Sequence, residues 1–321
     1  MTCSVVLGYW QDRPPAENVE IARNADALGY GELWLGEMAT YDAFALATAI
    51  GLQTTQITLT IGPLAVAVRT PMTMAMGVAS VAALTGRPTR LALGTSSTVV
   101  VERWHGRSRH RSVTALDEAA RAVRALLDGE KADVPGEVVG SRGYHLRLPA
   151  PGAHVTMAAF GDGALGAAAR HADRVVLNMV SPAMVGRFRE QLDARTDALG
   201  RPRLPMAVWL ATAVDPLEET IAQGLRGKVS YLAAPGYGEM FMAEGFGDVV
   251  ALARSGASPR DVLAALPPEL LAATGLVGDE ATVRARLAAY HRAGADEVCL
   301  VPATAGDPGG RRTLEALRPG C

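Results

Sequence analysis

The side chains best suited to chemistry lie at the ends of predicted strands. Glu37 closes the strand predicted over Tyr30–Glu37, and four hydroxyls begin where the strand predicted over Thr89–Ser96 ends. A half-buried carboxylate in such a position can hold and release a proton, although a structural carboxylate that binds backbone N–H groups is at least as good an explanation. Hydroxyls can bond ligand oxygens or simply form a polar loop with a helix cap. They are Thr95, Ser96, Ser97 and Thr98.

A tyrosine on a predicted loop is a further candidate. Tyr237 lies between two glycines in PGYGEMF, Pro235–Phe241, after the strand predicted over Leu204–Val214. A residue there could line the substrate side of a site or belong to a lid. An ordinary type II turn explains the Pro-Gly pair equally well.

The histidines do not suggest a metal site. His110, His145, His154, His171 and His291 form no H-x-x-x-H pattern and no cluster with carboxylates. Metal sites in proteins need such ligand sets. We therefore expect no bound metal.

The stretch TLTIGPLAVAVRTP, Thr58–Pro71, has the pattern of a strand until Gly62-Pro63 interrupts it. Apolar residues run through the stretch, as in a strand buried on both faces, yet proline removes a donor from the hydrogen-bonding ladder and glycine weakens a strand. The cis form of an X-Pro bond lies only about 0.5–1 kcal/mol above trans, so a cis peptide could turn the backbone toward a cavity. An ordinary bulge with a trans proline is the alternative.

A phosphate-binding turn is predicted where a strand leads into a helix. The segment His154–Gly163 runs from a strand into a helix that starts near Asp162. A helix N-terminus offers free N–H groups and the positive end of the helix dipole, which suits a phosphate. Asp162 could instead cap the helix.

Strands and helices alternate along the whole chain, which predicts a (β/α)8 TIM barrel. An open doubly wound sheet would usually carry G-x-G-x-x-G after the first strand, which here ends in GYWQDRPP. A hairpin over residues 130–149 and short helices over residues 217–274 are expected as insertions after strands 4 and 7. We expect one domain over residues 1–321. The predicted strands are Cys3–Trp10, Tyr30–Glu37, Gln56–Val68, Thr89–Ser96, His154–Phe160, Asp173–Val180, Leu204–Val214 and Glu297–Ala303.

The composition argues against several classes of partner. The chain has 321 residues, 49% of them hydrophobic, and a formal charge of −2 with acids and bases interspersed, so neither nucleic acid nor an anionic membrane is an expected partner. The three cysteines lack metal-ligand spacing and fit a reducing compartment. There is no signal-peptide pattern and no run of about 18 apolar residues. We expect a cytoplasmic protein.

Seven motifs, in order, resemble the bacterial luciferase-like family, and within it the oxidoreductases that use the deazaflavin coenzyme F420. The resemblance covers essentially the whole chain, and each motif lies at a strand end or in a loop. The motifs are LGYW (7–10), LWLGEMATYDAF (33–44), IGPLAVAVRTP (61–71), LALGTSSTVVVERWHG (91–106), MAAFGDG (157–163), HADRVVLN (171–178) and YLAAPGYGEMF (231–241).

The resemblance implies a pocket for the cofactor. It implies a cis peptide bulge at Gly62-Pro63, with Leu64 and Ala65, against which the cofactor ring rests. It implies that the hydroxyl run bonds cofactor oxygens and that His105 belongs to the site. The turn that receives the phosphate would comprise Ala158, Ala159, Phe160, Gly161, Asp162 and Gly163.

The chain departs from the family pattern at two places. Many relatives carry proline and a basic residue where this chain has Asp162 and Gly163, and a histidine where it has Met38. The first departure puts an acid beside the phosphate. The second leaves Glu37, with His105 and Tyr237, as the catalytic candidates.

Three functions remain open on these grounds. The first is an F420-dependent oxidoreductase that transfers hydride to or from a small organic substrate through a C=C, C=N or C=O bond, for instance in secondary metabolism. The second is an FMN-dependent monooxygenase of the same fold, and the third is a non-catalytic barrel that has lost its cofactor. Relatives commonly pair through helices near the second and third strands, so the resemblance implies a homodimer.

Overall fold

In the computed structural model, eight parallel strands close into a barrel. The strands follow one another around it in the order β1, β2, β3, β4, β7, β8, β9 and β11, and the pairing of β9 with β8 completes the ring. The structure describes residues 2–8, 12–37, 39–148, 150 and 153–319. The predicted (β/α)8 fold is confirmed.

The barrel strands are short and buried, as their apolar and β-branched residues predict. They are β1 (Thr2–Val6), β2 (Glu32–Leu35), β3 (Thr58–Ala65), β4 (Thr89–Gly94), β7 (Val155–Ala158), β8 (Arg174–Asn178), β9 (Met206–Val214) and β11 (Glu297–Pro302). A ninth strand, β10 (Gly275–Gly278), pairs with the second half of β9, and the sequence patterns had not predicted it.

Helices alternate with these strands as predicted. They are α1 (Glu17–Ala27), α2 (Ala43–Gly51), α3 (Pro71–Thr85), α4 (Ser112–Leu127), α5 (Asp162–His171), α6 (Pro182–Ala198), α7 (Glu218–Arg226), α8 (Val229–Leu232), α9 (Tyr237–Ala243), α10 (Gly247–Arg254), α11 (Pro259–Ala264), α12 (Pro268–Ala273), α13 (Glu280–Arg292) and α14 (Arg311–Ala316). The predicted hairpin consists of β5 (Lys131–Val134) and β6 (Ser141–His145), which pair antiparallel.

Two compact units make up the described chain. Unit 1 lies within residues 1–28, 178–189 and 208–321, and unit 2 within residues 29–177 and 190–207. No helix of the described residues is both long and apolar enough to cross a bilayer.

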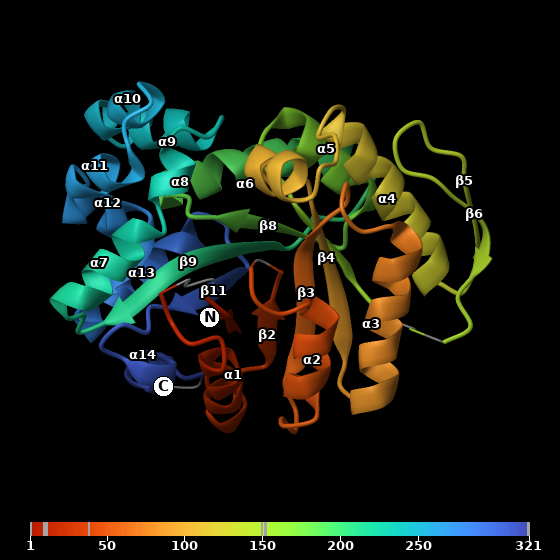
Figure 1. Cartoon of the computed structure of the whole chain (residues 1–321), viewed down its shortest axis with the longest axis horizontal. Helices are drawn as coiled ribbons and strands as arrows, with labels where there is room; N and C mark the ends of the chain where they lie inside the picture. Colours follow the sequence, from red (N-terminus) through yellow and green to blue (C-terminus); the bar gives the residue numbers. More distant parts are fainter. Residues whose placement is uncertain (1, 9–11, 38, 149, 151–152, 320–321) are drawn as a thin grey trace. The chain divides into compact units, whose positions relative to one another are not determined.

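In unit 2, the helices α2, α3 and α4 lie side by side along β3 and β4 (Figure 1). Their starts follow from local chemistry. Asp42 caps α2, because its carboxylate accepts hydrogen bonds from the N–H groups of Phe44 and Ala45 at 3.0 and 2.9 Å. Thr70 caps α3, and Pro71 occupies the first turn, where a missing N–H group removes no hydrogen bond.

A charged cluster is buried near the starts of the unit 2 strands. Glu32 of β2 accepts hydrogen bonds from Arg174 of β8, at 3.1 Å for Nη1, and from Arg90 of β4. Thr60 of β3 donates to the same carboxylate. The Arg174 guanidinium lies 4.2 Å from the centroid of the Trp34 ring. Both Glu32 and Arg174 are buried, so each depends on the other for compensation of its charge.

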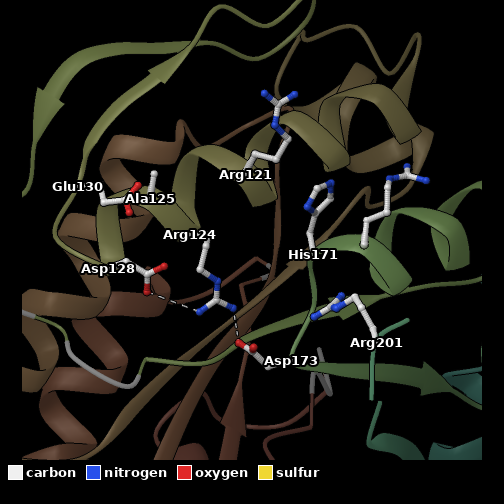
Figure 2. Close-up of a pocket in the computed structure, with 9 residues that line it drawn as sticks. Arg121, Arg124, Ala125, Asp128, Glu130, His171, Asp173 and Arg201 are labelled. Carbon is white, nitrogen blue, oxygen red and sulfur yellow. Dashed lines mark hydrogen bonds and ion pairs between the residues drawn. The ribbon is translucent and has the colours of Figure 1, made fainter. Parts of the chain in front are cut away.

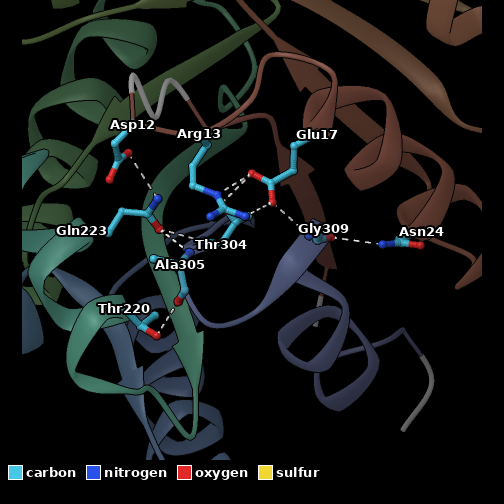
Figure 3. Close-up of polar contacts among 9 residues, drawn as sticks. All are labelled: Asp12, Arg13, Glu17, Asn24, Thr220, Gln223, Thr304, Ala305 and Gly309. Carbon is cyan, nitrogen blue, oxygen red and sulfur yellow. Dashed lines mark hydrogen bonds and ion pairs between the residues drawn. The ribbon is translucent and has the colours of Figure 1, made fainter.

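In unit 1, two buried side chains hold the loop that follows β11 (Figure 3). The Gln223 amide oxygen accepts hydrogen bonds from the N–H groups of Thr304 and Ala305 at 2.7 and 3.0 Å. Glu17 accepts from the Thr304 hydroxyl at 2.8 Å and from Arg13. Burial raises the pKa of Glu17, but the hydrogen bonds from Arg13, Thr304 and the Gly309 N–H group outweigh it and lower the pKa. The loop is therefore fixed by a satisfied polar network.

All eight barrel strands are shorter than predicted, and the segment around Tyr237 differs in type. The first strand was predicted to reach Trp10, but β1 ends at Val6, and positions 9–11 lie outside the described residues. The fourth strand ends at Gly94 rather than Ser96. Pro235–Phe241 was predicted to be a loop, but α9 begins at Tyr237, where Gly236 with φ +83° turns the chain into the helix.

Candidate functional site

The bulge in β3 is present as the sequence suggested. The Gly62-Pro63 peptide is cis. The register of β3 against β4 shifts between Ile61 and Leu64, so that β3 contains one extra residue. Gly62 has φ +125°, and a Cβ atom there would lie 2.1 Å from the carbonyl oxygen of Ala92. Only glycine fits this position.

The end of β4 forms an apolar surface with the bulge. A Cβ atom on Gly94 would lie 3.1 Å from Pro63 Cβ and 3.6 Å from Ala158 Cβ. Pro63, Gly94 and Ala158 thus meet at the ends of β3, β4 and β7, and we call these three residues the cradle. Gly94 was not among the predicted site residues, although it stands inside the LALGTSS motif. Leu64, also proposed for the pocket, is a core residue with 1% of its surface exposed.

The predicted hydroxyl run directly follows the cradle. Ser96 has φ +55°, a conformation that few residues other than glycine adopt. Ser97 accepts a hydrogen bond from the Val100 N–H group at 3.2 Å, so it caps the π-helix Val99–Trp104. The Thr95 hydroxyl accepts from Arg109 at 3.2 Å. Thr98 lies at the N-terminus of the π-helix and its side chain forms no capping bond. Part of the run is therefore structural, as the alternative reading proposed.

The predicted phosphate turn leads into α5. Gly161, with φ +96°, occupies the N-cap position, and no side chain caps the helix. Asp162 instead forms an ion pair with Arg195 of α6, so Asp162 is not the cap. Arg195 therefore balances the acidic charge that the sequence placed at this turn. A Cβ atom on Gly163 would approach a methyl group of Val113 to 3.2 Å.

Glu37 lies in a cluster with Arg69 and Asp42. The Arg69 guanidinium donates to both carboxylates, with its Nε 2.9 Å from Glu37 Oε2, and lies 5.0 Å from the centroid of the Phe44 ring. The hydrogen bond to Glu37 raises the pKa of Arg69. The Ala43 N–H group donates to Glu37 at 3.4 Å. This arrangement agrees with the alternative that Glu37 is a structural carboxylate. A role for Glu37 in proton transfer stays a prediction.

The other two catalytic candidates occupy different surroundings. His105 is exposed and follows the π-helix, where its N–H group donates to the Val100 carbonyl at 3.2 Å. In unit 1, the Tyr237 ring packs edge-on against Tyr231, with centroids 5.0 Å apart. Both phenols bond to the side chain of Asn178 at the end of β8, and burial raises the pKa of each. Met38 lies outside the described residues.

A cavity of about 440 Å³ lies at the other end of α4, lined by charged residues (Figure 2). Three of its four guanidinium groups have partners among the described residues: Arg124 binds Asp173, Arg170 binds Asp117, and Arg201 donates to the carbonyls of Ala169 and Ala172 at the end of α5. None of the predicted site residues lines this cavity. Figure 2 therefore shows a surface ion-pair network rather than part of the candidate site.

No group of three or more His, Cys, Asp or Glu side chains in the described part of the chain could hold a metal ion. The groups that could hold a ligand are instead the cradle, the hydroxyl run and the free N–H groups of α5. All three belong to unit 2. They offer an apolar surface, neutral hydrogen-bonding groups and an anion-binding helix end.

Comparison with known proteins agrees with this arrangement. A family model described as luciferase-like monooxygenase matches residues 4–297. A Mycobacterium tuberculosis protein, provisionally described as a coenzyme F420-dependent oxidoreductase, is 27% identical over 354 aligned residues, with 99% of each chain covered.

Solved structures show the same fold. The coenzyme F420-dependent tetrahydromethanopterin reductase of Methanopyrus kandleri superposes with a TM-score of 0.83 at 16% identity, covering 99% of this chain and 98% of that one. The FMN complex of the oxygenating component of 3,6-diketocamphane monooxygenase from Pseudomonas putida gives a TM-score of 0.71 at 16% identity, covering 99% and 97%.

Proposed function

Because the chain belongs to the luciferase-like monooxygenase family, we propose that it is an oxidoreductase that uses the reduced deazaflavin coenzyme F420. The proposed reaction transfers hydride to or from a small organic substrate, through a C=C, C=N or C=O bond. The M. tuberculosis relative and the M. kandleri structure, both described as F420-dependent, support this choice of cofactor. When bound, the reduced deazaflavin supplies the hydride.

The cradle is the observation that carries the proposal. Gly94 leaves its space empty between Pro63 and Ala158, and Gly62 lets the chain pass against Ala92 without a side chain. The resulting surface is small and uncharged, as the face of a planar ring requires. The residues present therefore fit a deazaflavin.

The neighbouring residues would bind and orient the cofactor. We assign the exposed Ser96 and Thr98 to its polar oxygens and the N–H groups at the start of α5 to its phosphate. Glu37, held by Arg69, and His105 are proposed to donate or accept the proton that accompanies the hydride. Positioning of this kind accounts for much of the rate enhancement in hydride-transfer enzymes.

An FMN-dependent monooxygenase is the second candidate, since an FMN-containing monooxygenase shares the fold. Turnover with each reduced cofactor separates the two. Product that requires oxygen and FMN, with none from the deazaflavin, would select the second candidate. If neither cofactor quenches protein fluorescence at high micromolar concentration, the chain is a barrel that has lost its cofactor.

The cradle is tested by Gly94→Val. Valine would place methyl groups where the Gly94 Cβ position already lies 3.1 Å from Pro63, so we expect deazaflavin binding to weaken at least tenfold, about 1.4 kcal/mol. Fluorescence titration measures the affinity, and circular dichroism checks the fold. The matched control is Gly31→Val, because nothing lies within 4 Å of a Cβ atom at Gly31. Unchanged affinity in Gly94→Val would contradict the proposed site.

We also propose a cytoplasmic homodimer that pairs through α2 and α3. Neither helix contains a charged residue, and Met72, Met76 and Leu84 of α3 are exposed. Exposed apolar surface of this kind marks protein–protein contacts. Light scattering should give twice the monomer mass of 33.5 kDa. A monomer at micromolar concentration would rule out the pairing.

A further inference from the structure

We propose that Arg109 binds an anionic oxygen of the cofactor, and this inference rests on the proposed function. Arg109 lies in the loop between the π-helix and α4, in the basic stretch RSRHRS. In the structure, the arginines of this stretch differ in their contacts and in their exposure.

The Arg109 guanidinium lies beside the residues that follow β4 and is hydrogen-bonded there to neutral groups. Its Nε donates to the carbonyl of Ser96 at 2.8 Å, and its Nη2 donates to the Thr95 hydroxyl at 3.2 Å. The positive φ of Ser96, +55°, accompanies this contact. Glu102 is also fixed nearby, but it accepts from the backbone N–H group of Arg109 at 3.2 Å.

Two anchors leave part of the guanidinium available. A guanidinium has five N–H donors in a rigid fork, and the two bonds above use its Nε and Nη2. Among the described residues, no carboxylate forms an ion pair with Arg109. Its positive charge is therefore not neutralised within this part of the chain.

Three other arginines of unit 2 are each paired with an acid. Arg69 is paired with Glu37 and Asp42, Arg195 with Asp162, and Arg111 with Glu137. Arg107 forms no ion pair among the described residues either, but it is exposed, whereas Arg109 is half-buried. An arginine that is partly buried, pre-positioned and without an acid is suited to recognise an anion from outside the chain.

The two residues that anchor Arg109 place its positive charge close to the cradle in the chain. Thr95 and Ser96, which anchor it, directly follow Gly94. A ligand on the cradle would therefore place polar atoms close to the anchors of Arg109. The ligand chemistry that fits is a negatively charged oxygen, either on the phosphate-bearing arm of the deazaflavin or on its ring.

Affinity measurements with two probes test the proposal and separate the two sources. The probes are the complete coenzyme and the deazaflavin headgroup that ends in its ribityl hydroxyls and lacks the phosphate. We expect Arg109→Met to weaken binding of the complete coenzyme at least tenfold in a fluorescence titration. Retained headgroup affinity would assign the contact to the arm, and an equal loss for both probes would assign it to the ring.

Controls distinguish this contact from general effects. Arg107→Met removes one positive charge from the same loop and should leave both affinities within twofold. Arg109→Gln keeps a hydrogen-bond donor without the charge, so it should also weaken binding while holding the loop, and thermal melting checks both Arg109 variants. Equal affinities of wild type and both Arg109 variants would overturn this inference alone. A wild-type protein that binds neither probe would overturn the proposed function with it.

Discussion

Replacement of Lys228 by methionine is expected to stabilise the protein, most strongly below pH 7. Lys228, at the start of α8 in unit 1, is 1% exposed. The one hydrogen bond given by its Nζ within the described residues goes to the Thr274 carbonyl at 3.3 Å. Burial lowers the pKa of Lys228 from 10.5 to about 7. A lysine buried without an acid favours the uncharged amine.

The sign of the pH dependence follows from proton counting. Between pH 7 and 10.5 the unfolded chain keeps the proton that the folded chain releases, so wild-type stability should rise with pH across this window. Below pH 7 the Lys228 amine is protonated in both the folded and the unfolded chain, so the fold bears the full penalty of burying its charge. At about 1.4 kcal/mol for each unit of pKa, it approaches about 5 kcal/mol, and loss of the hydrogen bond offsets about 1 kcal/mol. We therefore expect a net gain of about 2–4 kcal/mol at pH 6.5 that shrinks toward pH 10.

Urea denaturation at pH 6.5 and pH 9.5 measures this effect. The chain has two lysines, and the other, Lys131 on β5, is exposed. Lys131→Met is the matched control and should change stability by less than about 0.5 kcal/mol at both pH values. A Lys228→Met protein that unfolds more easily than wild type at pH 6.5 would refute the account of Lys228 as an uncompensated buried amine.

Glu32→Ala is expected to destabilise the protein by about 3–5 kcal/mol. The substitution leaves the buried Arg174 and its neighbour Arg90 without the carboxylate that both contact. It also removes the acceptor of the Thr60 hydroxyl. An uncompensated buried charge is costly because the surrounding protein cannot replace water as a solvent. The midpoint of guanidinium denaturation measures the loss.

Two further variants make this expectation specific. Glu315→Gln breaks the exposed pair in which the Glu315 side chain is 49% and the Arg311 side chain 73% exposed, and it should cost far less than Glu32→Ala. The double variant Glu32→Met/Arg174→Met removes both buried charges and should be more stable than Glu32→Ala. If Glu32→Ala costs no more than Glu315→Gln, the buried cluster does not stabilise unit 2.

Much of the fold could be predicted from local patterns. The alternation of apolar strands with amphipathic helices, the polar hairpin segment and the capping residues all act over a few residues, so they are visible in the sequence. The strand β10 escaped prediction because GLVG is four residues long and begins and ends with glycine. Its strand conformation depends on pairing with β9, which is distant in sequence.

The candidate site was predicted only where its residues give a local signal. Gly62-Pro63 is a local signal, because glycine and proline together are unusual in a buried strand. Gly94 gave no such signal, since its role comes from Pro63 and Ala158, which lie 31 residues before it and 64 residues after it. The ion pair of Glu37 with Arg69 likewise joins two strand ends that no periodicity connects.

The sequence by itself determined the order of elements, the barrel and the places where polar side chains end its strands. These depend on backbone sterics and hydrophobic periodicity, and both act between residues that are close in the sequence. Only the tertiary structure decided which arginines are neutralised, that Lys228 is buried with no acid bonded to it among the described residues, and that three small residues meet at one surface. Those properties depend on distance and on exclusion of water, and both arise only when remote segments pack together.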